Sequence, residues 1–458
     1  MAVTRRGVLS AGMGIAGLAV AGCSASPTTG GRPLPVSGVP APPDSPNLLV
    51  IFSDDHRADH LGLTGEVPFL QTPALDALAS EGVRFDRAYV TTALCSPSRA
   101  TLLTGQYASR HGVQNNLSSW IPGTPSFFDS LAAAGYRCAY IGKWHMPGEL
   151  PDLPGVDRFI TFTIEEGQGV YHDCPLIIDG VETPRPGTYV STDLTDFALQ
   201  WLAEDDDRPF CLVVAHKAVH HEFEPPADLL GTYDDVEIDL PDEAFTYQTL
   251  LDRNVWEGTA GRLQTSYRRY CETLLGMDRE IGRLLEGIDD NTAVIYTSDN
   301  GYSWGEHVLT GKRWAYDDNI KVPFIVRWPD GVASPGAVID EPVLNADIAP
   351  TLLDIAGVPI PASMQGRSIA PLIKGEPVEW RDDVFYEYFA DFPYQVPPSQ
   401  AVRTDRWLYI EYDRGLPPEL YDTLTDPEQR TNLAEEPAYS ATRQGLSQRL
   451  ADLRREYT

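Results

Sequence analysis

Positive charge is scarce in this chain. Its 458 residues hold 35 lysines and arginines against 66 aspartates and glutamates, which leaves a formal net charge of −31. This imbalance excludes nucleic acid as a partner, and it excludes electrostatic adhesion to an anionic lipid surface. The sequence also lacks an internal repeat of fixed period, which excludes a repeat architecture. It lacks a hydrophobic run long enough for a comfortable membrane span.

Cysteine is nearly as scarce, with six in the whole chain. Cys138 and Cys211 lie in apolar patterns of strand length and are predicted to be buried thiols. Whether Cys174 and Cys271 form a disulfide is left open, because disulfide connectivity cannot be deduced from sequence. The other two cysteines lie in motifs of their own.

Cys95 opens the most informative stretch, Cys-Ser-Pro-Ser-Arg-Ala-Thr-Leu-Leu-Thr-Gly. Ser96 is predicted to be the N-cap of a helix, with Pro97 at its first position and Gly105 at its C-terminal end. Cys95 then lies at the positive end of the helix dipole, and Arg99 adds charge one turn on. That arrangement places a nucleophile where it faces an anion. The plainer interpretation is a helix-capping turn with a buried free thiol.

Polar side chains follow two apolar runs of strand length. One run ends at Asp54 and Asp55, and the other ends before Asp299 and Asn300. Both runs are typical of buried parallel strands, whose carboxyl ends face the ligand site in open α/β sheets. Three carboxylates and an amide oxygen form a hard, anionic site that suits calcium, or alternatively magnesium, rather than zinc. Each pair alone is a weak signal, since Asp-Asn-Gly is first of all a turn.

Together, the Cys-x-Pro-x-Arg motif, the Leu-Thr-Gly that follows it and the acidic strand ends resemble the type I sulfatases. In that family the cysteine is oxidised after translation to formylglycine, and the hydrated aldehyde attacks sulfur. The resemblance implies formylglycine at Cys95 and a formylglycine-generating enzyme as the partner in maturation. It also implies a metal at position 95 and the four strand-end residues Asp54, Asp55, Asp299 and Asn300.

Further segments extend the resemblance from about residue 47 to residue 330. Gly-Lys-Trp-His, with Lys143 and His145, matches the family's Gly-Lys-x-His motif, and the segment around Lys312 matches that of its last catalytic lysine. These matches imply that Arg99, Lys143 and Lys312 neutralise the sulfate oxygens.

The family's mechanism implies three proton transfers. Asp299 takes the proton of the attacking hydroxyl. His220 or Lys312 protonates the leaving alcohol. His145 then deprotonates the second hydroxyl, so that sulfate is expelled and the aldehyde is regenerated.

Three stretches, residues 143–146, 167–171 and 216–220, look most like the branch that removes 6-sulfate from N-acetylglucosamine in mucins and glycosaminoglycans. The implied substrate is therefore a sulfated carbohydrate. The predicted substrate contacts are His216, Lys217, Trp144, Tyr171 and His172. The alternative for each aromatic residue is a packing role.

One departure from the family pattern concerns charge. His-Glu-Phe-Glu-Pro, with Glu222 and Glu224, stands where a short His-x-Pro is usual. Two carboxylates near the site count against a polyanionic substrate.

The first residues have the layout of a bacterial signal peptide, with a twin arginine at Arg5 and Arg6. Val-Ala-Gly-Cys, which ends at Cys23, resembles a lipobox, so residues 1–22 are predicted to be removed and Cys23 to be lipidated. The alternative is a plain signal peptide with an incidental cysteine. Residues 23–46 are typical of a flexible tether. The prediction is an exported enzyme, lipid-anchored at the outer face of the bacterial cell membrane or at the cell surface.

Helical and strand patterns alternate along the rest of the chain, which predicts a mostly parallel sheet flanked by helices. The resemblance implies that this fold is alkaline-phosphatase-like, with a catalytic domain at 47–375 and a small antiparallel-sheet subdomain at 376–458. Helices are predicted at 73–81, 126–134, 194–203, 265–285, 346–356 and 442–456. Strands are predicted at 47–52, 210–215, 293–296, 322–328, 384–389, 401–404 and 407–412.

Two other functions fit part of the pattern. A phosphodiesterase or phosphonate monoester hydrolase of the same superfamily would use the same metal, arginine and lysines on a phosphate. A lipid-anchored protein that binds sulfated glycans would have an unconverted Cys95. The complete set of ligands argues against this second alternative, since a silent site has no need of three converging carboxylates.

Overall fold

The computed structural model describes residues 40, 42, 44–151, 153–241, 244 and 260–458. The predicted signal peptide, Cys23 and most of the predicted tether lie outside these residues. No helix within the described ranges is long and apolar enough to cross a bilayer.

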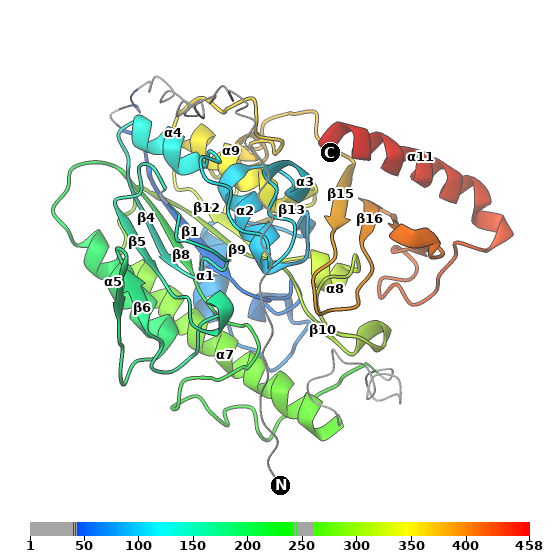
Figure 1. Cartoon of the computed structure of the whole chain (residues 1–458), viewed down its shortest axis with the longest axis horizontal. Coiled ribbons are helices and arrows are strands. Elements are labelled where there is room, and N and C mark those ends of the chain that lie inside the picture. The colour runs from blue at the N-terminus through cyan, green and yellow to red at the C-terminus, as the bar shows by residue number, and fades with distance from the viewer. Residues whose placement is uncertain (1–39, 41, 43, 152, 242–243, 245–259) are drawn as a thin grey trace, which may run out of the picture. The chain divides into compact units, whose positions relative to one another are not determined.

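A ten-stranded mixed sheet forms the centre of the molecule (Figure 1), with the order β13-β2-β12-β9-β1-β8-β4-β5-β6-β7. Five neighbouring strands in the middle run parallel. They are β9 (Thr292–Ser298), β1 (Asn47–Ser53), β8 (Phe210–Ala215), β4 (Arg137–Gly142) and β5 (Arg158–Thr161). The central residues of these strands are apolar because helices cover both faces of the sheet. This confirms the predicted α/β class.

The alternation of side chains in β1 shows how the two faces are filled. Leu48, Val50 and Phe52 belong to one buried apolar cluster, whereas Leu49 and Ile51 belong to the other. Helices α2 (Cys95–Thr104), α4 (Phe127–Ala133) and α9 (Ile348–Ile355) pack on the first face. Helices α1 (Pro73–Glu81), α5 (Val190–Leu202) and α7 (Ala260–Glu286) pack on the second face. Figure 1 shows the sheet between these two layers.

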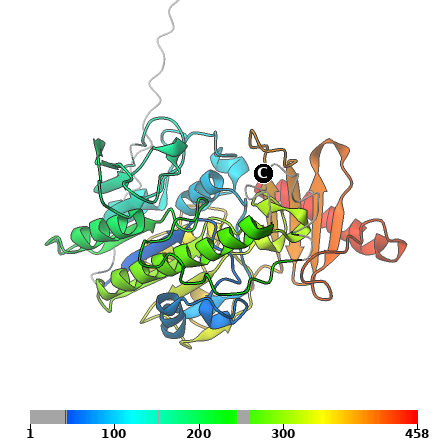
Figure 2. The same ribbon diagram turned by 90° about the horizontal axis from the view of Figure 1, so that it is seen from below.

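The C-terminal part is a four-stranded antiparallel sheet with one long helix beside it (Figure 2). Its strands are β15 (Asp383–Tyr388), β16 (Ser399–Thr404), β17 (Trp407–Tyr412) and β18 (Glu419–Asp422), and α11 (Ser440–Tyr457) packs on them. Apolar residues of this sheet belong to the same cluster as the first face of the large sheet. The residues that the structure describes all belong to one compact unit. The domain boundary near residue 375 stays a prediction.

The remaining elements are short. The strands are β2 (Val83–Phe85), β3 (Ala88–Tyr89), β6 (Leu176–Ile178), β7 (Val181–Thr183), β10 (Ser303–Trp304), β11 (Thr310–Gly311), β12 (Phe324–Arg327), β13 (Ala337–Ile339) and β14 (Val343–Leu344). The helices are α3 (Ala108–His111), α8 (Asp317–Ile320) and α10 (Ala370–Ile373).

One local prediction was wrong. Helix α2 begins at Cys95 with Leu94 as its N-cap, so Ser96 lies inside the first turn. Ser96 has other partners: its hydroxyl donates to the carbonyl of His145 at 2.6 Å, and its backbone N–H donates to Asn116 at 3.1 Å. The helix ends at Gly105 as predicted, because the φ of 66° there suits glycine.

The five cysteines that the structure describes are all buried free thiols. This confirms the prediction for Cys138 and Cys211. It also resolves the pairing that the sequence leaves open, because Cys174 and Cys271 are not joined in the structure.

Candidate active site

The predicted site residues collect at the carboxyl ends of four adjacent strands. Asp54 follows β1, Lys143 follows β4, His216 follows β8 and Asp299 follows β9. The strands are parallel neighbours, so the residues after them emerge at one edge of the sheet. A cavity of about 680 Å³ opens there, and its lining includes Lys217 from the loop after β8.

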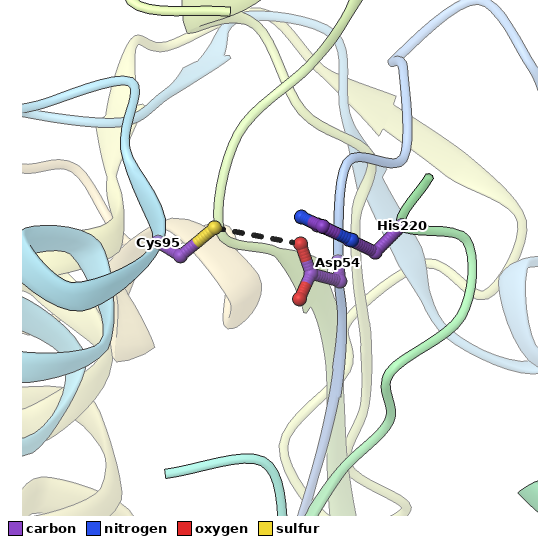
Figure 3. Close-up of side chains that lie close together, drawn as sticks. All are labelled: Asp54, Cys95 and His220. Carbon is purple, nitrogen blue, oxygen red and sulfur yellow. Dashed lines mark hydrogen bonds between the residues drawn. The ribbon is translucent and has the colours of Figure 1, made fainter. Parts of the chain in front are cut away.

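Cys95 meets these strand ends from α2 (Figure 3). Its Sγ atom lies 3.6 Å from Oδ1 of Asp54 and 2.8 Å from Nζ of Lys312. Burial raises the pKa of the Cys95 thiol to about 12, and the carboxylate of Asp54 pushes it in the same direction. The thiol is therefore protonated at neutral pH and is a poor nucleophile in its unmodified form.

Three carboxylates lie close to the thiol. Ligand atoms of Asp54, Asp55, Asp299 and Cys95 all lie within 4.8 Å of one another, and all four residues are buried. Burial raises the pKa of Asp55 to about 6, and the charges of Asp54 and Asp299 add to this effect. Such crowding of carboxylates is stabilised by a cation.

The donor set fits a hard divalent cation. Besides the three carboxylates, Asn300 is buried, and its Oδ1 atom has no hydrogen-bond partner in the structure. The amide nitrogen of Asn300 donates to Oδ1 of Asp55 at 2.6 Å, which ties the residue to the carboxylates. A site of carboxylate and amide oxygens suits calcium or magnesium.

Three buried cations surround the same carboxylates. Arg99 donates to Asp54 at 3.0 Å and to Asp299 at 2.8 Å. Lys143 pairs with Asp54, and Lys312 pairs with Asp55 at 2.5 Å. Burial by itself raises the pKa of Asp54, but the nearby cations, Lys143 first among them, hold it well below its usual range. Asp54 is thus held in its charged form, and the three cations are placed where they can stabilise an anion.

Two histidines, His145 and His220, line the same cavity. Burial and the charge of Lys143 lower the pKa of His145 and of His220 well below the ordinary value, so both rings are neutral at pH 7. Nδ1 of His220 donates to the carbonyl of His221 at 2.6 Å, which leaves Nε2 as a proton acceptor. A ring nitrogen of His220 lies within 4.8 Å of ligand atoms of Asp54 and Cys95. Figure 3 shows these three side chains close together.

The predicted substrate contacts are placed less uniformly. Trp144 and Lys217 line the cavity. Tyr171 is buried outside the lining, where its ring lies 4.8 Å from Nζ of Lys217 and its hydroxyl donates to the carbonyl of His220 at 2.6 Å. His172 is exposed outside the lining, and His216 is buried with neither ring nitrogen hydrogen-bonded in the structure.

Several residues at the site were not predicted from the sequence. Gln168 accepts a hydrogen bond from Nζ of Lys143 at 2.5 Å, and its signal was the Gly-Gln-Gly stretch around it. Arg313 and Asp391 line the cavity as an ion pair with an N–O distance of 2.7 Å. Asp391 comes from the loop between β15 and β16, and nothing in the sequence marks that loop as part of the site.

Comparison with known families agrees with this geometry. The model of the family described as Sulfatase matches residues 46–358. A second model, N-sulphoglucosamine sulphohydrolase, C-terminal, matches residues 305–456. The chain belongs to the sulfatase family and is a sulfuric ester hydrolase.

Individual relatives are similar over most of their length. An N-acetylglucosamine-6-O-sulfatase of Bacteroides thetaiotaomicron is 28% identical, over 90% of this chain and 87% of the relative. A protein solved in complex with its substrate D-glucosamine-2-N,6-O-disulfate is 28% identical with a TM-score of 0.83, over 90% of this chain and 98% of that one. The phosphonate monoester hydrolase of Agrobacterium radiobacter is 25% identical with a TM-score of 0.75, over 90% and 96%.

Proposed function

We propose that this chain hydrolyses the 6-sulfate ester of an N-acetylglucosamine-type sugar, with formylglycine formed from Cys95 as its nucleophile. The observation that carries the proposal is the position of Cys95. Its side chain lies among three carboxylates and beside the ammonium group of Lys312, and both Lys312 and Asp55 line the cavity. Relatives named for sulfated glucosamine substrates support the sugar class.

The case for a modified cysteine rests on the chemistry of the buried thiol. With a pKa near 12 the unmodified side chain is neutral at pH 7, so it neither attacks an ester nor serves as a strong metal ligand. A hydrated aldehyde at the same position supplies a hydroxyl nucleophile, and its second hydroxyl, once deprotonated, expels the sulfate and regenerates the aldehyde. A serine at that position would be trapped as a stable sulfate ester.

The chain's own residues then have distinct roles. Arg99, Lys143 and Lys312 hold the anionic oxygens of the ester, and neutral His145 and His220 are placed to move protons. Asp299 has a pKa raised mainly by burial, which makes it a better proton acceptor than an ordinary aspartate. We assign it the proton of the attacking hydroxyl.

Calcium is the metal that we assign to this site, with magnesium as the alternative. Asp54, Asp55, Asp299, Asn300 and position 95 would hold it. A divalent cation there supplies Lewis-acid stabilisation of the sulfate oxygens.

Export and anchoring belong to the same proposal. The twin arginine and the Val-Ala-Gly-Cys sequence support secretion and lipidation at Cys23, with a formylglycine-generating enzyme acting on Cys95 during maturation. The membrane is then a partner through the lipid anchor only.

The test is sulfate release from N-acetylglucosamine 6-sulfate by metal-loaded protein, measured by ion chromatography. We expect turnover of the sugar sulfate to exceed turnover of a phenyl phosphonate monoester. The opposite ranking would favour the second candidate function, that of a phosphonate monoester hydrolase. The similarity of this chain to such an enzyme is the reason for testing it. If neither ester is hydrolysed, the proposal is wrong.

A further inference from the structure

Two of the three lysines and arginines that line the cavity are committed to protein groups. Lys312 pairs with Asp55, and Arg313 donates two hydrogen bonds to Oδ2 of Asp391, at 2.9 and 2.7 Å. The guanidinium carbon of Arg313 also lies 3.4 Å from the ring centroid of Tyr394. Neither of these two cations is available for a second anionic group. Lys217, the third, has no carboxylate partner among the described residues, but the charge of Glu222 acts on it and its Nζ atom lies 4.8 Å from the ring centroid of Tyr171.

Three exposed glutamates give the outer part of the cavity, called the mouth here, a negative charge. Glu165, Glu166 and Glu222 line the cavity, and all three are exposed. They come from two separate segments, the 3₁₀ turn Glu165–Gly167 and the loop after β8. Within the ranges that the structure describes, none of the three carboxylates pairs with a lysine or an arginine.

The turn that carries two of these glutamates is fixed to the catalytic floor. Gln168, the residue after the turn, accepts the hydrogen bond from Lys143. Gly167 has a φ of 90°, and a Cβ atom there would lie 3.3 Å from the Cα atom of His145. Glu165 and Glu166 therefore keep their place relative to the site, because moving the turn would disturb Lys143 and His145.

Part of the exposed lining is apolar. Leu117 is 59% exposed and Phe392 is 80% exposed, and both line the cavity. Their segments are joined by a hydrogen bond from the backbone N–H of Asn116 to Asp391 at 3.2 Å. A substrate that fills the cavity thus meets both exposed carboxylates and exposed apolar surface.

We infer that the cavity selects esters in which the sulfate being removed is the only anionic group. Glu165, Glu166 and Glu222 repel a second sulfate or a carboxylate on the same molecule, since like charges near a low-dielectric wall are destabilising. The inference rests on the proposed function and narrows its substrate class to singly sulfated, otherwise uncharged hexosamines. N-sulfated glucosamine and sugars that carry a carboxylate are disfavoured.

The experiment compares kcat/KM for N-acetylglucosamine 6-sulfate and for D-glucosamine 2-N,6-O-disulfate. The wild-type protein is expected to prefer the first by about tenfold or more at low salt. The triple variant Glu165→Gln, Glu166→Gln, Glu222→Gln is expected to reduce this ratio by about tenfold, and high salt is expected to reduce it in the wild type. Glu224→Gln, an exposed position outside the lining, is the matched control and keeps the wild-type ratio.

An unchanged ratio in the triple variant, or a wild-type preference for the disulfate, would overturn the inference. If the triple variant does not fold, Glu222→Gln alone and the salt dependence of the wild type decide the question. A second pair, phenyl sulfate and 4-carboxyphenyl sulfate, applies the same test without a sugar. Preference for phenyl sulfate with no turnover of either sugar would support charge selection and reject the sugar. No turnover of any sulfate ester would reject both.

Discussion

In the charged cluster that reaches the cavity through Asp55 and Lys312, called the floor here, Arg99 and Lys143 are almost completely buried and each contacts a carboxylate. At the mouth, by contrast, Glu165 and Glu222 are exposed. Removing one partner of a buried ion pair leaves an uncompensated charge, which costs about 3–5 kcal/mol. Exposed carboxylates have no such cost, because water solvates them. The floor is therefore where chemistry and stability depend on the same residues, and the mouth can change selectivity with little effect on folding.

The largest expected effect separates chemistry from stability at the floor. Cys95→Ala is expected to lower kcat by about 10³-fold or more because it removes the nucleophile. The thiol is uncharged, so the Tm is expected to change little. Sulfate release and a thermal melt check the two statements. Cys211→Ala, a buried thiol in β8, is the control and keeps its activity.

Metal removal comes next in size. Treatment with a chelator is expected to abolish most of the activity, and added calcium is expected to restore it. Calcium is also expected to raise the Tm of the chelated protein by about 3 °C or more, since a ligand of the native state stabilises it. The control is Asp278→Asn, a carboxylate outside the cluster that accepts the N–H groups of Ala74 and Leu75. A Tm of the chelated protein that does not change when calcium is added would argue against a metal at the floor.

Gln168 connects the floor to the mouth, and its replacement is expected to have an intermediate effect. Gln168→Ala removes the acceptor that positions Lys143, so kcat is expected to fall by about tenfold. Because Gln168 carries no charge, the Tm is expected to change by less than it would for a floor cation. Gln448→Ala, an exposed glutamine on α11, serves as the control. Loss of stability without loss of kcat would contradict the positioning role.

Lys217 is expected to make KM depend on pH. Burial lowers its pKa to about 8, so the side chain is charged below pH 8 and becomes neutral as the pH rises through that value. If the ammonium holds the anionic substrate, KM rises above pH 8. Lys217→Arg stays charged, and its KM is expected to stay level over this range. The exposed Lys374→Arg is expected to follow the wild type, and a KM rise that persists in Lys217→Arg would exclude Lys217 as its cause.

The smallest effect is expected at the apolar part of the mouth. Phe392→Ala is expected to raise KM for an aryl sulfate by about threefold and to leave the Tm unchanged, since the side chain is 80% exposed. Leu424→Ala, exposed elsewhere, is the control. A change in Tm would place Phe392 in the packing of the fold rather than at the cavity.

The floor was more predictable from the sequence than the mouth. Asp54 and Asp299 directly follow buried apolar strands, and parallel strands bring their carboxyl ends to one edge, so local pattern and topology give the same answer. The α/β class and the bounds of α1, β8 and β17 follow from periodicity in the same way. The predicted N-cap at Ser96 was wrong because a tertiary contact with His145 takes its hydroxyl.

The mouth could not be predicted from the sequence in this way, because loops that are far apart in the chain form it. Asp391 lies 275 residues from Asn116, to which it is hydrogen-bonded, and no local pattern records that contact. Tyr171 was predicted to contact substrate from its aromatic character, but its position under Lys217 depends on how the loop folds. Its role, like that of His172, stays a prediction.

The central claim is that position 95 carries the nucleophile in a modified form. The most direct measurement is the mass of the proteolytic peptide that contains residue 95, from active protein made in its natural host. The account predicts a peptide about 18 Da lighter than the unmodified sequence, and its reaction with a hydrazine reagent, because an aldehyde has replaced the thiol. Fully active protein that contains only unmodified cysteine at this position would contradict it.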